Sequence, residues 1–393
     1  MAAKLKHLPQ GLRTVLAVAL LTMATWAIAV DLRADHPETY VVQRGDTLWD
    51  IAGQFLQRPW LWPEIWQANP QIENPHLIYP GDVISLAYLD RVQAPQAVVQ
   101  PGPRTEAPIG GVSLAEVGPF LKDLQVVDAV KRLPYIVALE GDRLRSSQDQ
   151  LAYAAELRGA VPGQRVSIMR PVKRYVRRGR VSGCCDVFHV TDLDRRARTI
   201  FDTQDFWDDA MMIDTGGDTL GYELMRMADA TVSRGAVNGA EAATLLLDPN
   251  SLEVRVGDRI VPYVAQAYDA QFFPHPPRQQ FAYGRARILA VAGMVATGGP
   301  HDVVAISVGI RDGIDNGTVF SSWRPGSNIP DRVFNPDDTE GWFSKDAKTR
   351  LPDEFAGHLM VFRSFEKMSY ALVMDSVKPT RVGYELKHPD ATQ

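Results

Sequence analysis

The chain has 393 residues, of which 45% are hydrophobic and 23% are charged, and its formal net charge is -5. This length is too great for one ordinary hydrophobic core, so we expect two or three domains of a folded protein. This weakly negative net charge gives no electrostatic reason to expect a nucleic acid as a partner.

The N-terminus has the pattern of a secretory signal. Basic residues precede an apolar run over residues 14–30, which contains the small-residue triplet Ala27-Ile28-Ala29. This pattern predicts a signal peptide over residues 1–29 and an exported protein of the periplasm or cell envelope. A retained segment is the alternative, because an apolar run of this length can also cross a bilayer, and only then is the membrane a partner.

The stretch from residue 39 to residue 86 favours a strand, two helices and a second strand. Residues 40–43 suit a short strand, and either Asp46 or Thr47 can cap the helix that follows. Apolar residues at 48, 51, 52 and 55 form the stripe of one amphipathic helix. A second helix contains Pro63 in its first turn and ends at Asn69-Pro70, and a Pro-Gly turn then leads into the closing strand.

Three elements of this stretch resemble the LysM family: GDTLWDIA at 45–52, the helix end at 68–70 and the strand at 77–84. The resemblance implies a peptidoglycan-binding module over residues 39–88, with a βααβ fold that binds N-acetylglucosamine glycans such as peptidoglycan and chitin. It also implies a shallow groove between the loop after the first strand and the loop before the second. The glycan-binding residues implied on this sequence are Gly45, Asp46, Thr47, Leu48, Asn69, Pro70, Leu77 and Ile78.

Structural roles compete with glycan binding at several of these positions. Leu48 and Ile78 can be plain core residues, and Asp46 can be a helix cap. The region also holds Trp49, Trp60, Trp62 and Trp66, in and around an interhelical loop that is more aromatic than the common pattern. A tryptophan-rich core explains these side chains, whereas an exposed indole could stack on a sugar ring. A single small module with one groove is expected to bind glycan weakly, which suits tethering more than tight capture.

After a Pro-rich linker over residues 89–112, the sequence predicts mainly β-structure. Short β-branched runs alternate with turn residues, although the spacing over 114–133 is compatible with a helix. We expect one β-rich domain over 113–278, with an inserted loop at 172–214, and another over 279–390. The fold class is therefore α+β.

Within the inserted loop, the basic stretch from Lys173 to Arg180 suggests a solvated segment. After it, Gly217-Asp218-Thr219-Leu220 repeats the GDTL tetrapeptide of the module but suggests only a turn that enters a strand.

A faint internal repeat runs through the C-terminal part. The pattern G-x6-R-P occurs at 163–171 and again at 317–325, and an apolar run followed by Val-Gly comes later in each copy, at 256–257 and 382–383. The pattern predicts two copies of a small β unit, with chance similarity as the competing explanation.

Catalytic and metal-binding patterns are incomplete. Ser182-Gly183-Cys184 is similar to the nucleophile region of L,D-transpeptidases, but an upstream histidine to activate the thiol is missing. Cys184, Cys185 and His189 could approach a metal ion but would need a fourth ligand. We therefore predict no catalytic residue, no metal and no cofactor.

As a whole, the chain resembles secreted proteobacterial proteins that join a signal peptide, one LysM module and a long C-terminal region. This arrangement predicts a non-catalytic, wall-tethered adaptor, with peptidoglycan and an unknown envelope protein as partners and no nucleic acid. One alternative is a peptidoglycan hydrolase or transpeptidase directed to the wall by the module. The other is a structural component of the envelope.

Overall fold

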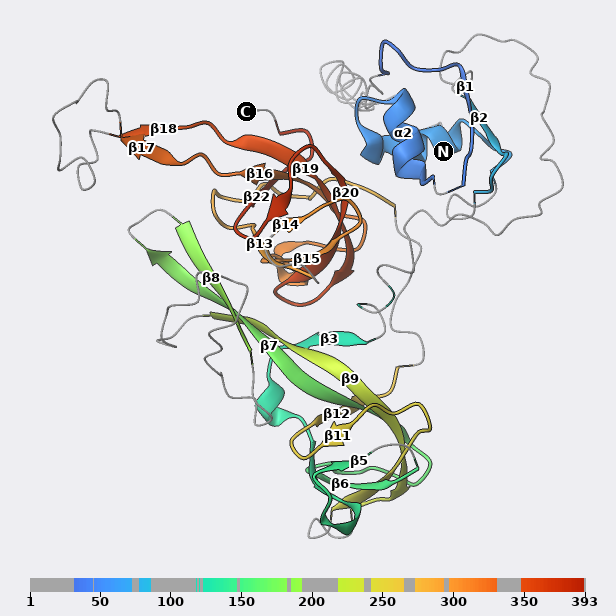
Figure 1. The fold of residues 1–393 in the computed structure, drawn as a ribbon, viewed down its shortest axis with the longest axis vertical. Coiled ribbons are helices and arrows are strands. Elements are labelled where there is room, and N and C mark those ends of the chain that lie inside the picture. Colours follow the sequence, from blue (N-terminus) through green and yellow to red (C-terminus); the bar gives the residue numbers. More distant parts are fainter. Residues whose placement is uncertain are drawn as a thin grey trace, which may run out of the picture.

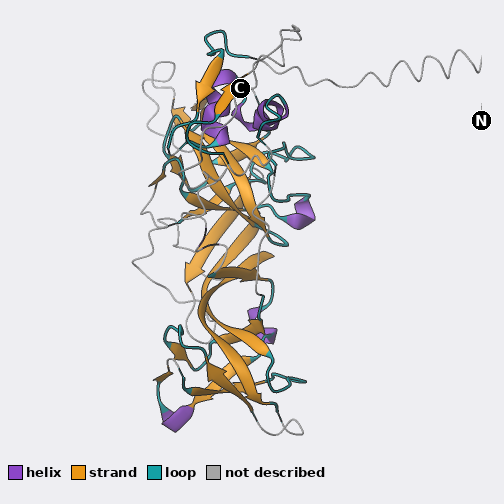
Figure 2. Ribbon diagram, turned by 90° about the vertical axis from the view of Figure 1, so that its right-hand side faces the viewer, coloured by secondary structure: helices purple, strands orange, loops and turns teal. Residues whose placement is uncertain are grey.

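The computed structural model describes residues 32–44, 46–72, 78–85, 118, 120, 123–146, 149–181, 185–192, 218–236, 242–264, 273–292, 297–330 and 348–391. The expected signal peptide (1–29) and linker (89–112) lie outside these ranges. Figures 1 and 2 show an elongated molecule in which the helices of the N-terminal segment lie at one end and strands make up most of the rest. Within the described ranges, no helix is both long enough and apolar enough to cross a membrane.

The N-terminal module has the predicted order of strand, two helices and strand. Its elements are β1 (Thr39–Val41), α2 (Leu48–Phe55), the 3-10 helix η2 (Pro59–Leu61), α3 (Trp62–Gln67) and β2 (Val83–Ser85). The two strands pair antiparallel, with Tyr40 opposite Ile84. The apolar stripe of α2 is buried, as its spacing predicts, so the helix packs on the core through that face.

The middle of the chain forms a closed barrel. Its elements are β3 (Leu124–Val127), η3 (Val130–Arg132), β4 (Tyr135–Leu139), η4 (Glu140–Asp142), β5 (Arg145–Ser146), β6 (Leu151–Ala155), β7 (Arg165–Val181), β8 (Cys185–Asp192), β9 (Asp218–Arg234), β10 (Ala243–Leu247), β11 (Val254–Arg255) and β12 (Arg259–Pro262). The order β4-β6-β10-β9 continues through β7 and β12 back to β4, which closes the first barrel. Ile136, Ile168, Leu245 and Ile260 fill its interior.

The C-terminal part forms a second barrel. Its elements are β13 (Ile288–Val291), β14 (Thr297–Gly298), β15 (Val303–Ile306), η5 (Ile310–Asp312), β16 (Val319–Arg324), β17 (Asn328–Pro330), β18 (Lys348–Arg350), β19 (Glu354–Ser364), β20 (Ser369–Ser376), β21 (Thr380–Arg381) and β22 (Glu385–Lys387). The sheet order is β13-β15-β20-β19-β16-β22, and a bridge between Arg287 and Glu385 closes it. Ile288, Val304, Phe320 and Val373 lie in its interior.

The two barrels are copies of one design, which confirms the predicted repeat. Strands β4, β6, β10, β9, β7 and β12 of the first barrel correspond in order to β13, β15, β20, β19, β16 and β22 of the second. The short pair β5–β11 corresponds to β14–β21. Even the irregularities agree, because the β7–β9 register shifts after Ile168 and the β16–β19 register shifts after Ser322, at matching positions. Chance similarity between the two sequence segments would not give both barrels the same strand order, the same register and a register shift at the same position.

Glycines mark the same turns in both copies. Gly163 and Gly317 have φ of 86° and 94°, and each donates its backbone N–H to a carbonyl of the adjacent barrel strand, β9 in the first barrel and β19 in the second. Gly257 and Gly383 have φ of 98° and 83° in the turns before β12 and β22. A positive φ is strained for residues with a side chain, so these turns kept their glycine while other positions diverged.

The described part of the expected insertion is strand instead of loop. Strands β7 and β9 have 17 residues each and continue beyond the first barrel, where β8 pairs with β7. We call residues 171–181, 185–192 and 218–225 the arm (Figure 1). The expectation of a solvated loop at Lys173–Arg180 is wrong, because this stretch belongs to β7, which pairs with β9 as far as Arg177, and Arg177 bonds to Asp218 at 2.9 Å. The strand expected from residue 218 is confirmed.

The helix-compatible spacing over 114–133 is correct only in part where the structure describes it. Gly118 and Phe120 are helical, whereas residues 124–127 are β3, which pairs with β9 of the arm. The hydrogen-bond partners of this strand lie about a hundred residues away, at 222–225, so local spacing could not reveal them.

The arm lies on the second barrel. Strand β8 lies beside β13, and Tyr175 and Leu220 of the arm share one apolar cluster with Phe362 and Tyr370 of the second barrel. Glu223 of the arm is 7% exposed and accepts hydrogen bonds from the hydroxyls of Tyr175, at 2.7 Å, and Tyr370, at 2.6 Å. Burial, with the nearby Glu223 carboxylate, raises the pKa of Tyr370 well above its usual value. The hydroxyl therefore stays a donor, and the contact joins the two barrels.

Candidate glycan-binding site

The loop between β1 and α2 is held by two carboxylates with different roles. Thr47 is the N-cap of α2 and forms a capping box with Asp50. Asp46 instead closes the turn: one of its oxygens accepts from the backbone N–H of Gln43, at 2.7 Å, and from the hydroxyl of Tyr40, at 3.0 Å. Of the two residues that could cap the helix, Thr47 does so. Asp46 fixes the shape of one wall of the predicted groove.

The side chain of Asn69 links the loop on the other side of the predicted groove to strand β2. Its side-chain N–H groups donate to the carbonyls of Ile65, at 2.7 Å, and Ser85, at 2.8 Å, and its side-chain oxygen accepts from Ser85 N–H at 2.9 Å. The side chain is 1% exposed, so these bonds replace water completely. The end of α3 is thereby fixed against β2.

A Pro-Gly turn completes this side of the module. Gly81 has a φ of 93° and donates to the carbonyl of Val42, while Asp82 accepts from the backbone N–H of Tyr79 at 3.0 Å. The turn therefore brings the chain back beside β1 in the geometry that only glycine adopts without strain.

The predicted glycan-binding residues differ in exposure. Leu48, Asn69 and Ile78 are 1%, 1% and 0% exposed and Thr47 is 8% exposed, whereas Asp46 is half-buried and Pro70 is exposed. Gly45 and Leu77 lie outside the described residues. The buried residues can contact a sugar only through main-chain atoms of the two loops. Of the described residues in the predicted site, Asp46 and Pro70 are the ones whose side chains are accessible to a sugar.

Replacing Asn69 with alanine is expected to lower the free energy of unfolding by about 2 kcal/mol, because buried main-chain groups lose their partners. Guanidinium unfolding of the full chain measures the loss. Gln71→Ala is the control: Gln71 is exposed and bonds to Asn69 and Val83, so its loss should cost less than about 1 kcal/mol. Equal losses for both variants would contradict the role given to Asn69.

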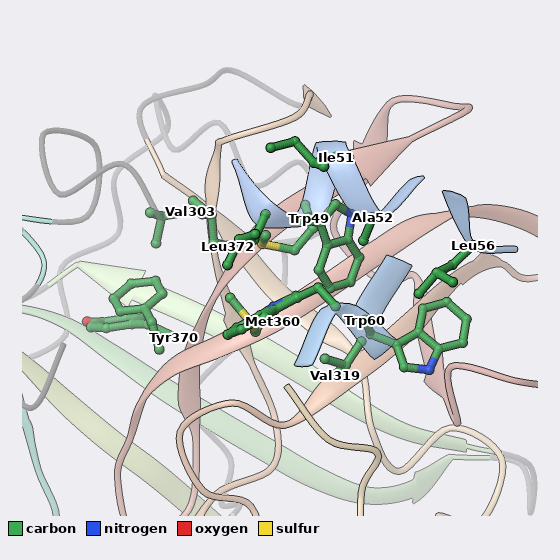
Figure 3. Close-up of a cluster of buried hydrophobic side chains, with 14 of the residues drawn as sticks. Trp49, Ile51, Ala52, Leu56, Trp60, Val303, Val319, Met360, Tyr370 and Leu372 are labelled. Carbon is green, nitrogen blue, oxygen red and sulfur yellow. The ribbon is translucent and has the colours of Figure 1, made fainter. Parts of the chain in front are cut away.

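The tryptophans of the module face the second barrel as well as the module core. Trp49, Trp60 and Trp62 are 3%, 5% and 4% exposed and belong to one apolar cluster with Met360 and Leu372 of the second barrel (Figure 3). The core interpretation is therefore confirmed for these three, but the core is shared between two domains. Sugar stacking by these three side chains would require the module to leave the barrel.

Polar contacts fix the same interface. The indole N–H of Trp49 donates to Asp375 at 3.2 Å, and the Trp60 ring lies 4.7 Å from the His358 ring. His358 Nδ1 lies 2.9 Å from an Asp375 oxygen. Burial alone would raise the pKa of Asp375, but hydrogen bonds and charge from His358 outweigh it and hold that pKa below its usual value. Asp375 thus stays an acceptor for both neighbours.

A second aromatic contact lies beside α3. The ring of Phe273, which follows the first barrel, is stacked on Trp66 at 5.7 Å and tilted against Trp62 at 5.7 Å. Sequence reasoning missed Phe273, His358 and Asp375 because none lies near the module in the chain. The unusually aromatic interhelical loop was the signal for an additional partner.

One group of residues contains the side chains of a Ser-His-Asp hydrolase without its geometry. Ser321 lies opposite His358 on neighbouring strands, and His358 contacts Asp375. However, Ser321 is 0% exposed and its hydroxyl donates to the carbonyl of His388 at 2.7 Å, while Trp49 and Trp60 pack on the His358 ring. The hydroxyl is therefore neither directed at a base nor open to substrate.

A metal site is not formed by the side chains that can be placed. Over the described ranges, no three His, Cys, Asp or Glu residues lie together as potential ligands. The side chains of Cys184, Cys185 and His189, the candidate ligands named from the sequence, lie outside the described part of the structure.

Comparison with known proteins identifies the module. Residues 40–87 match the LysM domain model, as a single module. Domains of this family bind N-acetylglucosamine glycans of the peptidoglycan and chitin type and typically occur in extracellular or wall-associated proteins. The chain is also 38% identical over 60 residues to "Uncharacterized protein YqbP" of Bacillus subtilis (strain 168), which covers 13% of this chain and 27% of that protein. The similarity thus spans about a quarter of that relative.

Proposed function

Because residues 40–87 are a LysM domain, which binds glycans of the peptidoglycan type, we propose that the protein is a non-catalytic, wall-tethered adaptor of the cell envelope. The match to the LysM domain is the observation that carries the proposal. The protein is exported to the periplasm or cell envelope, binds peptidoglycan through the two loops around Asp46 and Pro70, and presents its barrels to an envelope protein.

The contacts between the module and the second barrel support a tethering role. A module joined only by a linker would sample many orientations, whereas this module shares an apolar cluster with the second barrel and bonds to it through Trp49 and Asp375. Binding to the wall therefore orients the barrels as well as localising them.

A sedimentation assay with purified peptidoglycan tests the proposal. The full chain is expected to pellet with the glycan, and Asp46→Ala should weaken binding about tenfold, or about 1.4 kcal/mol, because the turn that shapes the groove loses its acceptor. Asp35→Ala is the matched control, since this exposed carboxylate pairs with Arg33 at the edge of the module. Failure of the full chain to pellet would refute the glycan-binding role.

The same incubation separates the adaptor from an enzyme. Chromatography of the supernatant should show no soluble muropeptides and no change in the cross-links of the pelleted wall. Release or exchange of muropeptides would replace the adaptor with a peptidoglycan-remodelling enzyme. Unchanged function in the envelope after loss of glycan binding would favour a structural component.

A further inference from the structure

We propose that copies of this chain associate head to tail, with the β17–β18 hairpin of one copy lying on the outer face of the first barrel of the next. The outer face is defined here by Val137, Leu151, Tyr153 and Leu246, on the adjacent strands β4, β6 and β10. This inference does not depend on glycan binding. It follows from the duplication of the barrels and from a difference between the two copies.

The β17–β18 hairpin is the second barrel's counterpart of the arm. In the first barrel, β7 and β9 pair at Arg170 and Met225 and then continue as the arm. In the second barrel, β16 and β19 pair at Arg324 and Glu354, and the ladder continues through β17 and β18, with Asn328 opposite Arg350. Each barrel therefore extends a pair of strands from the same edge, and in the arm β8 and β3 add to that pair.

The arm covers the neighbouring barrel. In the described part of the β17–β18 hairpin, by contrast, Arg350 contacts Tyr283 of its own barrel and Ile329 is left exposed. Tyr175 of the arm and Ile329 of β17 stand the same number of positions after the left-handed glycines of their barrels. Tyr175 is 2% exposed under the second barrel, whereas Ile329 is 42% exposed and Leu351 beside the hairpin is 41% exposed. Figure 1 shows the β17–β18 hairpin extending from the second barrel at the end of the molecule far from β5 and β6.

The two barrels also differ on the face that receives a hairpin. Leu289, Val303, Ala305 and Leu372 of the second barrel are 2%, 4%, 4% and 1% exposed, beneath the arm and the module. The matching positions of the first barrel are also apolar or aromatic: Leu151 pairs with Leu246 as Val303 pairs with Leu372. Yet Val137 and Leu246 are 43% and 42% exposed, and Leu151 and Tyr153 are partly exposed.

A second copy is the occupant that these observations favour. The molecule already contains one instance of such a contact, in which the arm that extends from the first barrel lies on the outer face of the second. The exposed apolar residues of the hairpin and of the first barrel's outer face are the two halves of a further instance. The hairpin and the outer face are different surfaces at different ends of the molecule, so the contact is heterologous. Further copies can therefore add to a dimer and form an open chain or a ring.

Sedimentation velocity on the full chain tests this association. The native protein should form species that grow beyond the dimer as its concentration rises. Leu246→Asp on the face and Ile329→Asp on the hairpin should each raise the dissociation constant more than tenfold and leave monomers. Leu144→Asp is the matched control: Leu144 is 83% exposed on the first barrel but outside the face, and its variant should associate like the native chain.

An equimolar mixture of the two monomeric variants is the decisive sample. Each variant keeps the surface that the other lacks, so the mixture should form a one-to-one dimer that does not grow. Native protein that stays monomeric would overturn the proposal, as would association unaffected by either variant. A mixture that stays monomeric, or in which each variant forms symmetric dimers alone, would also overturn it. Circular dichroism confirms that each variant is folded.

Discussion

Replacing Glu223 with alanine is expected to lower the free energy of unfolding by about 3 to 5 kcal/mol and to free the arm from the second barrel. Glu223 accepts from two tyrosine hydroxyls, at 2.7 and 2.6 Å, and all three side chains are buried. Without the carboxylate, the hydroxyls of Tyr175 and Tyr370 would each lose a short hydrogen bond inside an apolar cluster, where such a loss is costly.

Guanidinium unfolding measures this loss, and hydrogen exchange at β20 shows whether the arm has separated. Glu223→Gln keeps an acceptor and should lose less than the alanine variant. Glu366→Ala is the control, because Glu366 is an exposed residue of the second barrel, on which the arm lies. A loss below about 1 kcal/mol in Glu223→Ala, with unchanged exchange, would show that the apolar cluster alone holds the arm.

Replacing Trp60 with alanine is expected to cost about 3 kcal/mol and to separate the unfolding of the module from that of the second barrel. Trp60 is 5% exposed, and its ring lies 4.7 Å from that of His358. Truncation leaves a cavity where two domains share one core, so the domains lose the contact that makes them unfold together.

Calorimetry is the measurement for this variant. The native chain should unfold its module and second barrel in one transition, whereas Trp60→Ala should show an earlier, separate transition. Trp60→Phe, which keeps an aromatic ring against His358, should restore most of the coupling. His358→Ala approaches the same contact from the barrel side and should act like Trp60→Ala. Separate transitions in the native chain would contradict the shared core.

The module was predictable because its determinants are local. The stripe of α2, the cap at Thr47 and the Pro-Gly turn before β2 all lie within a few residues of what they stabilise. Its docking was not predictable, since Trp49 and its acceptor Asp375 are separated by 326 positions. A pattern of tryptophans shows that a surface is apolar but does not show what covers it.

The barrels show the same division between local and distant information. The duplication was visible at turns such as Gly163 and Gly317, where the backbone requires glycine, while strand positions varied freely under a common register. The arm was mistaken for a loop because its basic residues bond to partners such as Asp218, which follows a long intervening segment. The glycan-binding assignment stays a prediction, since main-chain groups carry much of it.

The uninterrupted course of β7 and β9 has a mechanical consequence. Both strands run without a break from the first barrel into the arm, and their ladder lies along the line that joins the barrels. If the module is fixed on the wall and the first barrel is pulled away, the load passes through covalent backbone and through many hydrogen bonds that share the stress. Such a joint yields at the docking contacts of Trp49 and Glu223 before it yields within the strands.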